Sequence, residues 1–217
     1  MLYVTEKETI DNFQEIYYTK KDQTWGNTWW MGIKAQKSPL DLFIYQEILY
    51  GIRPDLIIET GTAEGGSAYY LAHMCDLLAN GRVITIDNNE YYGGEEINRP
   101  THPRITYHMA SSVDSQTINY LKKQITPNMK VLVILDSDHK KQHVLEEINL
   151  YSKFVTKDSY LIVEDSCING HPVFSNFGPG PMEAINEFLL TNSEFVVDTS
   201  REKFLMTFNP KGFLKKI

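Results

Sequence analysis

The chain has 217 residues, 42% of them hydrophobic and 23% charged, so it can bury a core without disulfides or a structural metal. Its net charge of −7 argues against a surface that follows nucleic-acid phosphates, and the two cysteines form no CxxC pair. The polar N-terminus lacks an apolar signal region, and no apolar run approaches the roughly 20 residues that span a bilayer. We therefore expect a cytoplasmic protein with reduced thiols and neither nucleic-acid nor membrane partners.

Helical stretches and short apolar runs alternate along the chain. A helix is predicted over residues 6–21, a tryptophan-rich patch (Trp25, Trp29, Trp30) follows, and Ser38-Pro39 is typical of a helix start. Strands are expected at 55–59, 82–87, 104–108, 130–135 and 159–163, helices at 68–80, 115–124, 141–151 and 181–190, and an antiparallel pair at 195–198 and 204–208. This order predicts an α/β fold, a Rossmann-like doubly wound and mostly parallel sheet with an antiparallel C-terminal strand pair. One domain covers residues 1–217, with 1–37 as an N-terminal helical and aromatic extension.

Ligands of such sheets bind at the carboxyl ends of the strands, and a glycine-rich turn follows the first predicted strand. Gly61 permits a tight turn or a close ligand approach, and Gly65 opens the next helix, whose amides favour anions. The spacing is not GxGxxG, which favours S-adenosylmethionine over a dinucleotide. The alternative is a structural turn that merely needs glycines. The cofactor-binding candidates here are Glu59, Gly61, Thr62, Glu64, Gly65 and Ser67.

Polar residues also follow the second and third predicted strands. Asp87, with Asn88 beside it, stands where an acidic residue accepts hydrogen bonds from ribose hydroxyls, although Asp and Asn also cap turns. Ser111 and Ser112 are candidates for the adenine edge, and capping of the following helix is the open alternative.

Carboxylates follow the fourth and fifth predicted strands. Neighbouring strands of a parallel sheet would bring Asp136, Glu164 and Asp165 together, and a hard divalent cation such as Mg²⁺ would relieve their repulsion. In the alternative, some of these residues cap helices and face water.

Two candidate catalytic residues, Asp136 and His139, lie in the same stretch, and Asp136 is also a candidate for cofactor binding. His139 follows the proposed ligand Asp136 and is the candidate general base toward a hydroxyl, with Asp138 and His143 as rivals. A capping or surface role for His139 stays open. The loop from His171 to Pro181 is either a substrate lid or an ordinary connection. The tryptophan patch is an aromatic wall over the pocket, core packing or a subunit contact.

Several segments together resemble the cephalosporin hydroxylase family, which includes rhamnosyl O-methyltransferases. The similarity runs from about Trp25 to the terminal NPKGFL and rests on RPDLIIETGTAEGGSA, VITIDN, VLVILDSDH, HVLEEINLY, YLIVEDS and GPGPMEAINEFL. The resemblance implies a class I methyltransferase fold that binds S-adenosylmethionine, with Mg²⁺ at Asp136, Glu164 and Asp165. The strand-end pattern is also similar to catechol-type O-methyltransferases, which have a lysine where this chain has His139. Where the family usually has Gly-Asp-Ser near the adenine, this chain has Ala110-Ser111-Ser112.

The resulting hypothesis is a metal-dependent O-methyltransferase that acts on a hydroxyl of a sugar or a secondary-metabolite scaffold and works as a homo-oligomer. Two alternatives stay open. One is an oxidoreductase or hydroxylase on a natural-product scaffold, although non-haem iron oxygenases usually use two histidines and a carboxylate. The other is a cofactor-binding protein without turnover.

Overall fold

The computed structural model describes residues 4–21, 24–89, 91–92 and 95–217, and its elements alternate as the sequence predicts. The α-helices are α1 (Glu6–Thr19), α2 (Pro39–Ile52), α3 (Gly66–Leu77), α4 (Ser115–Gln124), α5 (Lys141–Tyr151) and α6 (Pro181–Thr191). The main-sheet strands are β3 (Leu56–Thr60), β4 (Arg82–Asp87), β7 (Ile105–Met109), β8 (Val131–Leu135), β9 (Tyr160–Val163), β10 (Phe195–Val197) and β11 (Phe213–Lys216). Small hairpins join β1 (Trp29–Trp30) to β2 (Ile33–Lys34) and β5 (Tyr91–Tyr92) to β6 (Glu95–Glu96). Short 3₁₀ turns are η1 (Thr24–Asn27) and η2 (Thr199–Glu202).

The seven-stranded sheet has the order β10-β11-β9-β8-β3-β4-β7. Neighbouring strands run parallel except in the two pairs that contain β11. The chain winds outward from β3 through β4 to β7 and then returns to β8, on the other side of β3. This is the doubly wound arrangement that the sequence predicts. It creates a switch point between β3 and β8, the place where such sheets bind ligands.

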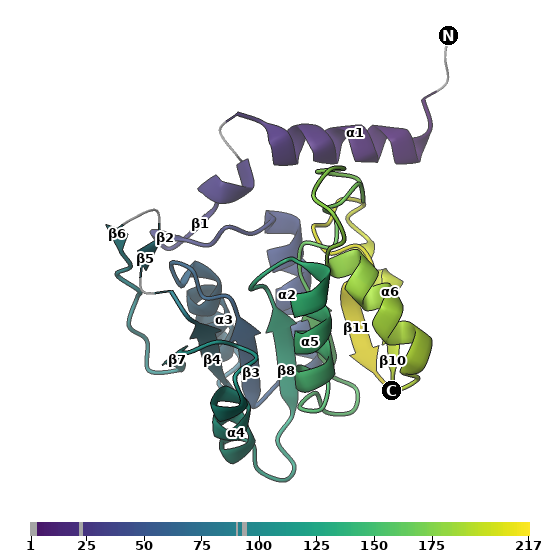
Figure 1. Cartoon of the computed structure of the whole chain (residues 1–217). Helices are drawn as coiled ribbons and strands as arrows, with labels where there is room; N and C mark the ends of the chain where they lie inside the picture. Colours follow the sequence, from purple (N-terminus) through teal and green to yellow (C-terminus); the bar gives the residue numbers. More distant parts are fainter. Residues whose placement is uncertain (1–3, 22–23, 90, 93–94) are drawn as a thin grey trace.

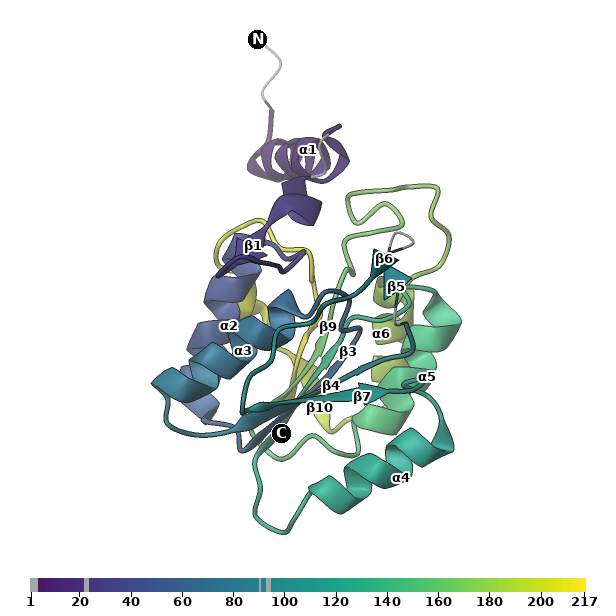
Figure 2. The same cartoon turned by 90° about the vertical axis from the view of Figure 1, so that its left-hand side faces the viewer.

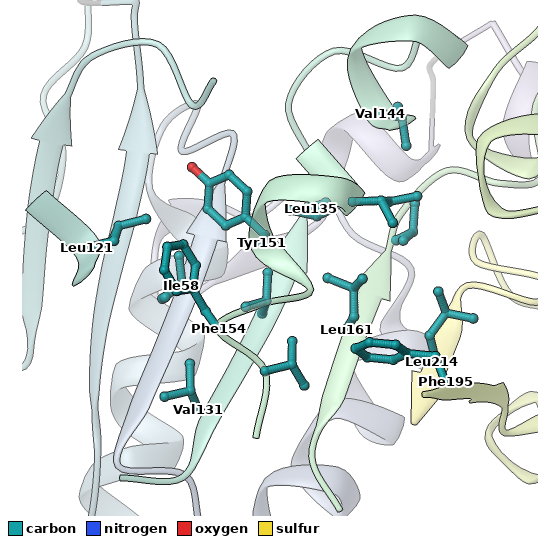
Figure 3. Packing of buried hydrophobic residues seen from close by; sticks show 14 of the residues in the cluster. Ile58, Leu121, Val131, Leu135, Val144, Tyr151, Phe154, Leu161, Phe195 and Leu214 are labelled. Atoms are coloured by element: carbon teal, nitrogen blue, oxygen red, sulfur yellow. The ribbon is translucent and has the colours of Figure 1, made fainter. Parts of the chain in front are cut away.

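Helices cover both faces of the sheet. Helices α2 and α3 pack on one face, and α4, α5 and α6 pack on the other (Figure 2). Neighbouring residues of β3 therefore serve two cores, because Ile57 points toward α2 and α3 whereas Ile58 packs with Leu135 and Tyr151 (Figure 3). Burial on both sides explains why these strands are continuously apolar rather than alternating. Among the described residues, none of the helices has the length and apolar character that crossing a bilayer requires.

The prediction that residues 204–208 form the antiparallel partner of residues 195–198 is wrong. The antiparallel partner of β10 is Phe213–Lys216, whereas residues 204–208 form a loop. Leu205 has φ +71°, which breaks an extended run, and the Phe208 amide donates to the Asp41 carboxylate (2.9 Å) at the start of α2. Residues 204–208 therefore anchor a loop to α2 and to the pocket rim. The next apolar segment, Phe213–Lys216, forms the strand of the sheet.

The N-terminal region packs on the carboxyl-end side of the sheet. Helix α1 lies outside the two helical layers (Figure 1), and the Gln14 side chain ties it to the Thr207 carbonyl (2.7 Å). The tryptophans do not form one wall. Trp25 stacks on Tyr18 (5.6 Å between ring centroids), whereas the Trp30 indole donates to His73 on α3 (2.8 Å).

Candidate functional site

A pocket of about 830 Å³ opens at the carboxyl ends of the parallel strands, beside the switch point between β3 and β8. This is within the usual size range of small-molecule sites. Its lining comes mainly from the segments that follow the strands, as the sequence predicts. Of the predicted site residues, the pocket is lined by Gly61, Thr62, Ser67, Asp87, Asn88, Ser111, Ser112, Asp136, His139 and Asp165.

Gly61 is where the turns after β3 and β8 meet. It has φ +85°, and a Cβ on this residue would lie 1.7 Å from the Asp136 carbonyl oxygen. Its amide donates to the Ile86 carbonyl on β4 (2.8 Å). Only a glycine therefore allows the β3 turn to lie directly against the residue that begins the carboxylate cluster.

Asp87 faces the pocket from the end of β4. Its Oδ2 accepts the amides of Thr62 (3.0 Å) and Ala63 (2.9 Å), and its Oδ1 accepts the amide of Asn89 (2.9 Å). The Arg99 guanidinium lies 3.6 Å from the same carboxylate and donates to the Ala63 carbonyl (2.9 Å). These donors keep a carboxylate in the pocket wall with a fixed orientation. Arg99 could not be identified from sequence, because no short-range motif marks it.

The remaining candidates of the glycine turn have different places. Ser67 lines the pocket. Glu59 is fully buried beneath the lining, accepts a hydrogen bond from Thr85 (2.6 Å), and has a pKa that burial raises. Glu64 lies outside the lining, with its carboxylate 3.7 Å from the Lys34 ammonium. Gly65 is the left-handed N-cap residue of α3, at φ +84°.

The turn after β7 contributes both serines to the pocket. They do not cap α4, because Asp114 is its N-cap and accepts the Gln116 amide (2.8 Å). The Ser112 hydroxyl lies 3.3 Å from Nε2 of His143, which belongs to α5. His143 thus lies beside the turn after β7 and is not part of the Asp136–His139–Asp165 group.

The side chain of His143 is part of a polar network in the pocket wall. Its Nε2 lies 3.1 Å from the Ser137 hydroxyl, which donates to the buried Glu147 carboxylate (2.8 Å). Hydrogen bonding to Glu147 raises the pKa of His143, whereas burial opposes the rise.

The carboxylate cluster forms where β8 and β9 end side by side. Donor atoms of Asp136, His139 and Asp165 all lie within 4.8 Å of one another, and His139 Nε2 is 3.2 Å from Asp165 Oδ2. The Asp165 amide donates to the Asn209 side chain (3.0 Å), which fixes the turn. Burial raises the pKa of Asp136 to about 7, with Lys37 opposing and Asp165 adding to the rise.

Glu164, the other predicted ligand, is buried behind this group and outside the pocket lining. Its Oε1 accepts the Tyr45 hydroxyl (2.8 Å), and its Oε2 lies 2.6 Å from the Lys37 ammonium. Lys37 also pairs with Asp136. Lys37 could not be identified from sequence, because its position depends on how the segment before α2 packs on the sheet.

The donor set fits a hard divalent cation. Asp136 and Asp165 bring two carboxylates to one side of the pocket, and the raised pKa of Asp136 reflects the cost of holding its charge away from water. Mg²⁺ sites often use one or two carboxylates and complete their shell with water and substrate oxygens. The ring nitrogen of His139 is a softer donor and better suited to carrying a proton.

Aromatic side chains form the outer rim of the pocket. Tyr18 of α1 stacks on Trp25 and makes edge contacts with Phe174 (5.0 Å) and Phe208 (5.1 Å). From the predicted lid loop, Phe174 and Phe177 line the pocket, whereas His171 pairs with Glu183 at the start of α6 (2.9 Å). The pocket thus has an aromatic part of its lining as well as the polar carboxylate cluster.

Solved structures with the same architecture define the class. The apo structure of CmcI aligns with a TM-score of 0.67 and 20% identity over 88% of this chain and 77% of that chain. A putative caffeoyl-CoA O-methyltransferase from Staphylococcus aureus aligns with a TM-score of 0.55 and 13% identity over 89% of this chain and 86% of that chain. The fold is that of class I methyltransferases, as the sequence resemblance implies.

Sequence comparison narrows this class. The family model for rhamnosyl O-methyltransferase/CmcI matches residues 22–217. A rhamnosyl O-methyltransferase from Mycobacterium tuberculosis is 38% identical over 99% of this chain and 87% of that protein, and one from Mycobacterium leprae is 36% identical over 99% and 93%. The chain therefore belongs to the rhamnosyl O-methyltransferase/CmcI family.

Proposed function

We propose that this protein transfers the methyl group of S-adenosylmethionine to a hydroxyl of a small molecule, with the help of a divalent cation. The acceptor class is a sugar or a natural-product scaffold. One observation carries the proposal: a single pocket joins the Gly61 turn and Asp87 to the Asp136–His139–Asp165 group. Family membership agrees with it.

The cofactor would lie along the turns after β3, β4 and β7. Asp87 and Asn88 would bind the ribose hydroxyls, and Ser111 and Ser112 the adenine. The methionine end would lie against Gly61, Thr62 and Ser67, with Glu59 and Gly65 supporting the turn and Glu64 at its edge. Bound there, S-adenosylmethionine supplies an electrophilic methyl group. One CmcI structure, with a TM-score of 0.63 and 18% identity, is described as a Mg-SAM complex.

The cation site would use Asp136 and Asp165, with Glu164 beside them. A cation bound to these carboxylates makes a coordinated hydroxyl more acidic. His139 would accept the proton of the acceptor hydroxyl, because its ring lines the pocket and Asp165 orients it (3.2 Å). The carboxylates and the glycine turn would hold the acceptor oxygen in line with the methyl group, and this positioning is a large part of the rate enhancement.

The aromatic rim supports a sugar-bearing acceptor. Tyr18, Trp25 and Phe174 line the same pocket as the cluster, and aromatic rings pack against the C–H side of a sugar ring. The relatives at 38% and 36% identity are named rhamnosyl O-methyltransferases. A deoxysugar hydroxyl is therefore the first acceptor to test.

The test combines binding and turnover. Calorimetric titration with S-adenosylmethionine should give a single site, and S-adenosylhomocysteine should form when rhamnosides and Mg²⁺ are supplied. Removal of the cation with EDTA should stop product formation, and added Mg²⁺ should restore it. Binding of S-adenosylmethionine without product from any rhamnoside or other glycoside would contradict the proposed acceptor class, and lack of binding would contradict the proposed function itself.

Asp87→Asn should weaken the binding of S-adenosylmethionine by about tenfold or more. Hydrogen bonds to a charged acceptor contribute about 1.5–3 kcal/mol, and the amide keeps the shape of the side chain but not its charge. Calorimetric titration measures the change. Asp114→Asn is the matched control, because Asp114 caps α4 and an asparagine caps equally well. If the Asp87 variant and the unchanged protein bound S-adenosylmethionine with equal affinity, Asp87 would not be part of the cofactor site.

His139→Gln should lower kcat by about 10²- to 10⁴-fold and leave Mg²⁺ affinity intact, since a general base contributes this much to turnover. Rates of S-adenosylhomocysteine formation and Mg²⁺ titrations measure the two effects. His171→Gln, on a histidine that pairs with Glu183, is the control. A parallel loss of Mg²⁺ affinity in His139→Gln would instead make His139 a ligand.

A further inference from the structure

A lysine lies inside the acidic cluster. Lys37 is 3% exposed, and its ammonium pairs with Asp136 on β8 and with Glu164 on β9 (2.6 Å). Its own backbone amide donates to the Thr28 hydroxyl (2.9 Å), which fixes the segment before α2. A long side chain from the N-terminal region therefore bridges the ends of two core strands.

The charges around this ammonium show what it does. Asp136 and Asp165 lie in a half-buried group with His139, Glu164 is buried behind this group, and Glu59 lies close enough to act on Lys37 electrostatically. Burial alone would lower the pKa of Lys37, but Asp136 and Glu164 raise it, so the ammonium keeps its charge. Buried charges of one sign are costly unless a counter-charge is present.

The contacts of Glu164 differ from those of the other carboxylates. Both of its oxygens already have buried donors, the Tyr45 hydroxyl (2.8 Å) and the Lys37 ammonium. The Tyr45 hydroxyl in turn accepts from the Asn209 side chain (3.1 Å). Asp136 also pairs with Lys37, but Asp136 and Asp165 line the pocket, whereas Glu164 does not.

We propose that Lys37 is an internal counter-cation of the metal site. Its ammonium offsets the charge of Glu164, so that the net charge that attracts a divalent cation is that of Asp136 and Asp165. Lys37 is thus a positioning residue. It stabilises the acidic cluster before a cation binds, and it limits the affinity for that cation. This inference rests on the proposed function, because it requires a cation at the cluster.

The test is a double-mutant cycle on Mg²⁺ affinity, with calorimetry for Mg²⁺ and electron paramagnetic resonance for Mn²⁺. Lys37→Met should raise the affinity, and Glu164→Gln should lower it, each by at least about tenfold, because a unit charge is added or removed beside the dication. The double variant keeps the net charge and should return to within about threefold of the unchanged protein, since the two effects oppose each other. Lys203→Met, which breaks a surface pair with Glu47 (2.6 Å), is the charge-loss control.

Thermal unfolding gives a second readout that does not depend on turnover. In EDTA, Lys37→Met should melt at a lower temperature than the unchanged protein, Mg²⁺ should recover most of the loss, and the double variant should need no such rescue. If Lys37→Met does not fold in EDTA, the melting temperatures of the double variant with and without Mg²⁺ are compared with those of the unchanged protein.

The results separate the two proposals. Unchanged or weaker Mg²⁺ binding in Lys37→Met, or a double variant as weak as Glu164→Gln, would overturn the role of Lys37 alone. Lack of Mg²⁺ and Mn²⁺ binding by the unchanged protein would overturn the cation part of the proposed function, and this inference with it.

Discussion

Asp136→Asn is expected to reduce methyl transfer by at least about a thousandfold while S-adenosylmethionine still binds. The amide keeps the size of the side chain and leaves the Gly61 contact unchanged, because that contact involves the Asp136 backbone. What it removes is the negative charge of a carboxylate that lines the pocket within 4.8 Å of donors on His139 and Asp165. Rates of S-adenosylhomocysteine formation with Mg²⁺, set beside calorimetric titration with the cofactor, measure the two effects separately.

Asp55→Asn provides the control for this substitution. Asp55 stands before β3 at the opposite end of the sheet, where its carboxylate accepts the Lys130 amide (2.7 Å), and an asparagine oxygen can do the same. Its turnover should match that of the unchanged protein. If Asp136→Asn kept full Mg²⁺-dependent activity, the carboxylate cluster would not be the metal site.

Gly61→Ala should destabilise the protein by more than about 3 kcal/mol and abolish binding of both S-adenosylmethionine and Mg²⁺. A Cβ at this position would lie 1.7 Å from the Asp136 carbonyl oxygen and 2.5 Å from its carbonyl carbon, so the turns after β3 and β8 would have to separate. Separation would move the glycine turn and the carboxylate cluster at once. Urea unfolding curves give the loss of stability, and titrations give the two affinities.

Gly32→Ala isolates the steric part of this effect. Gly32 also has a left-handed backbone, at φ +83°, but a Cβ there would meet no atom within 4 Å. It should therefore cost only about 1 to 2 kcal/mol, the strain of a left-handed alanine. If both alanine variants lost the same small amount of stability, the close approach to Asp136 would be unimportant.

The pocket walls could be predicted from sequence because strand ends are local features. Apolar runs end at Asp87 and Asp136, and in a parallel sheet these ends must lie at one edge, so chain order alone brings their side chains to the same region. Gly61 was predictable too, because it directly follows a strand end, but its close contact with the Asp136 carbonyl was not. The alternation of strands and helices predicted a doubly wound, mostly parallel sheet, but the order of its strands, and so the position of the switch point between β3 and β8, came only from the structure.

Residues that reach the site through packing could not be predicted. Lys37 precedes a helix and resembles a surface lysine in sequence, yet the docking of its segment places it between two strand ends. Arg99 likewise reaches the pocket wall, beside Asp87, from a segment without a motif. His143 was a candidate base from sequence, but its position beside Ser112 and Ser137 could not be predicted. The last strand was misassigned because residues 204–208 (FLMTF) are more apolar than residues 213–216 (FLKK). The left-handed backbone of Leu205 and the contact of Phe208 with Asp41, which keep the first segment in a loop, have no sequence signal.

The packing of the N-terminal region has a consequence for any shortened form of this enzyme. A chain beginning at residue 38 would retain every strand of the main sheet, so its fold would be complete if judged by the sheet alone. It would lack Tyr18 and Trp25 at the mouth, Lys34 and Ala35 on the wall, and the ammonium of Lys37. The shortest fragment with a complete pocket is therefore longer than the shortest fragment with a complete main sheet.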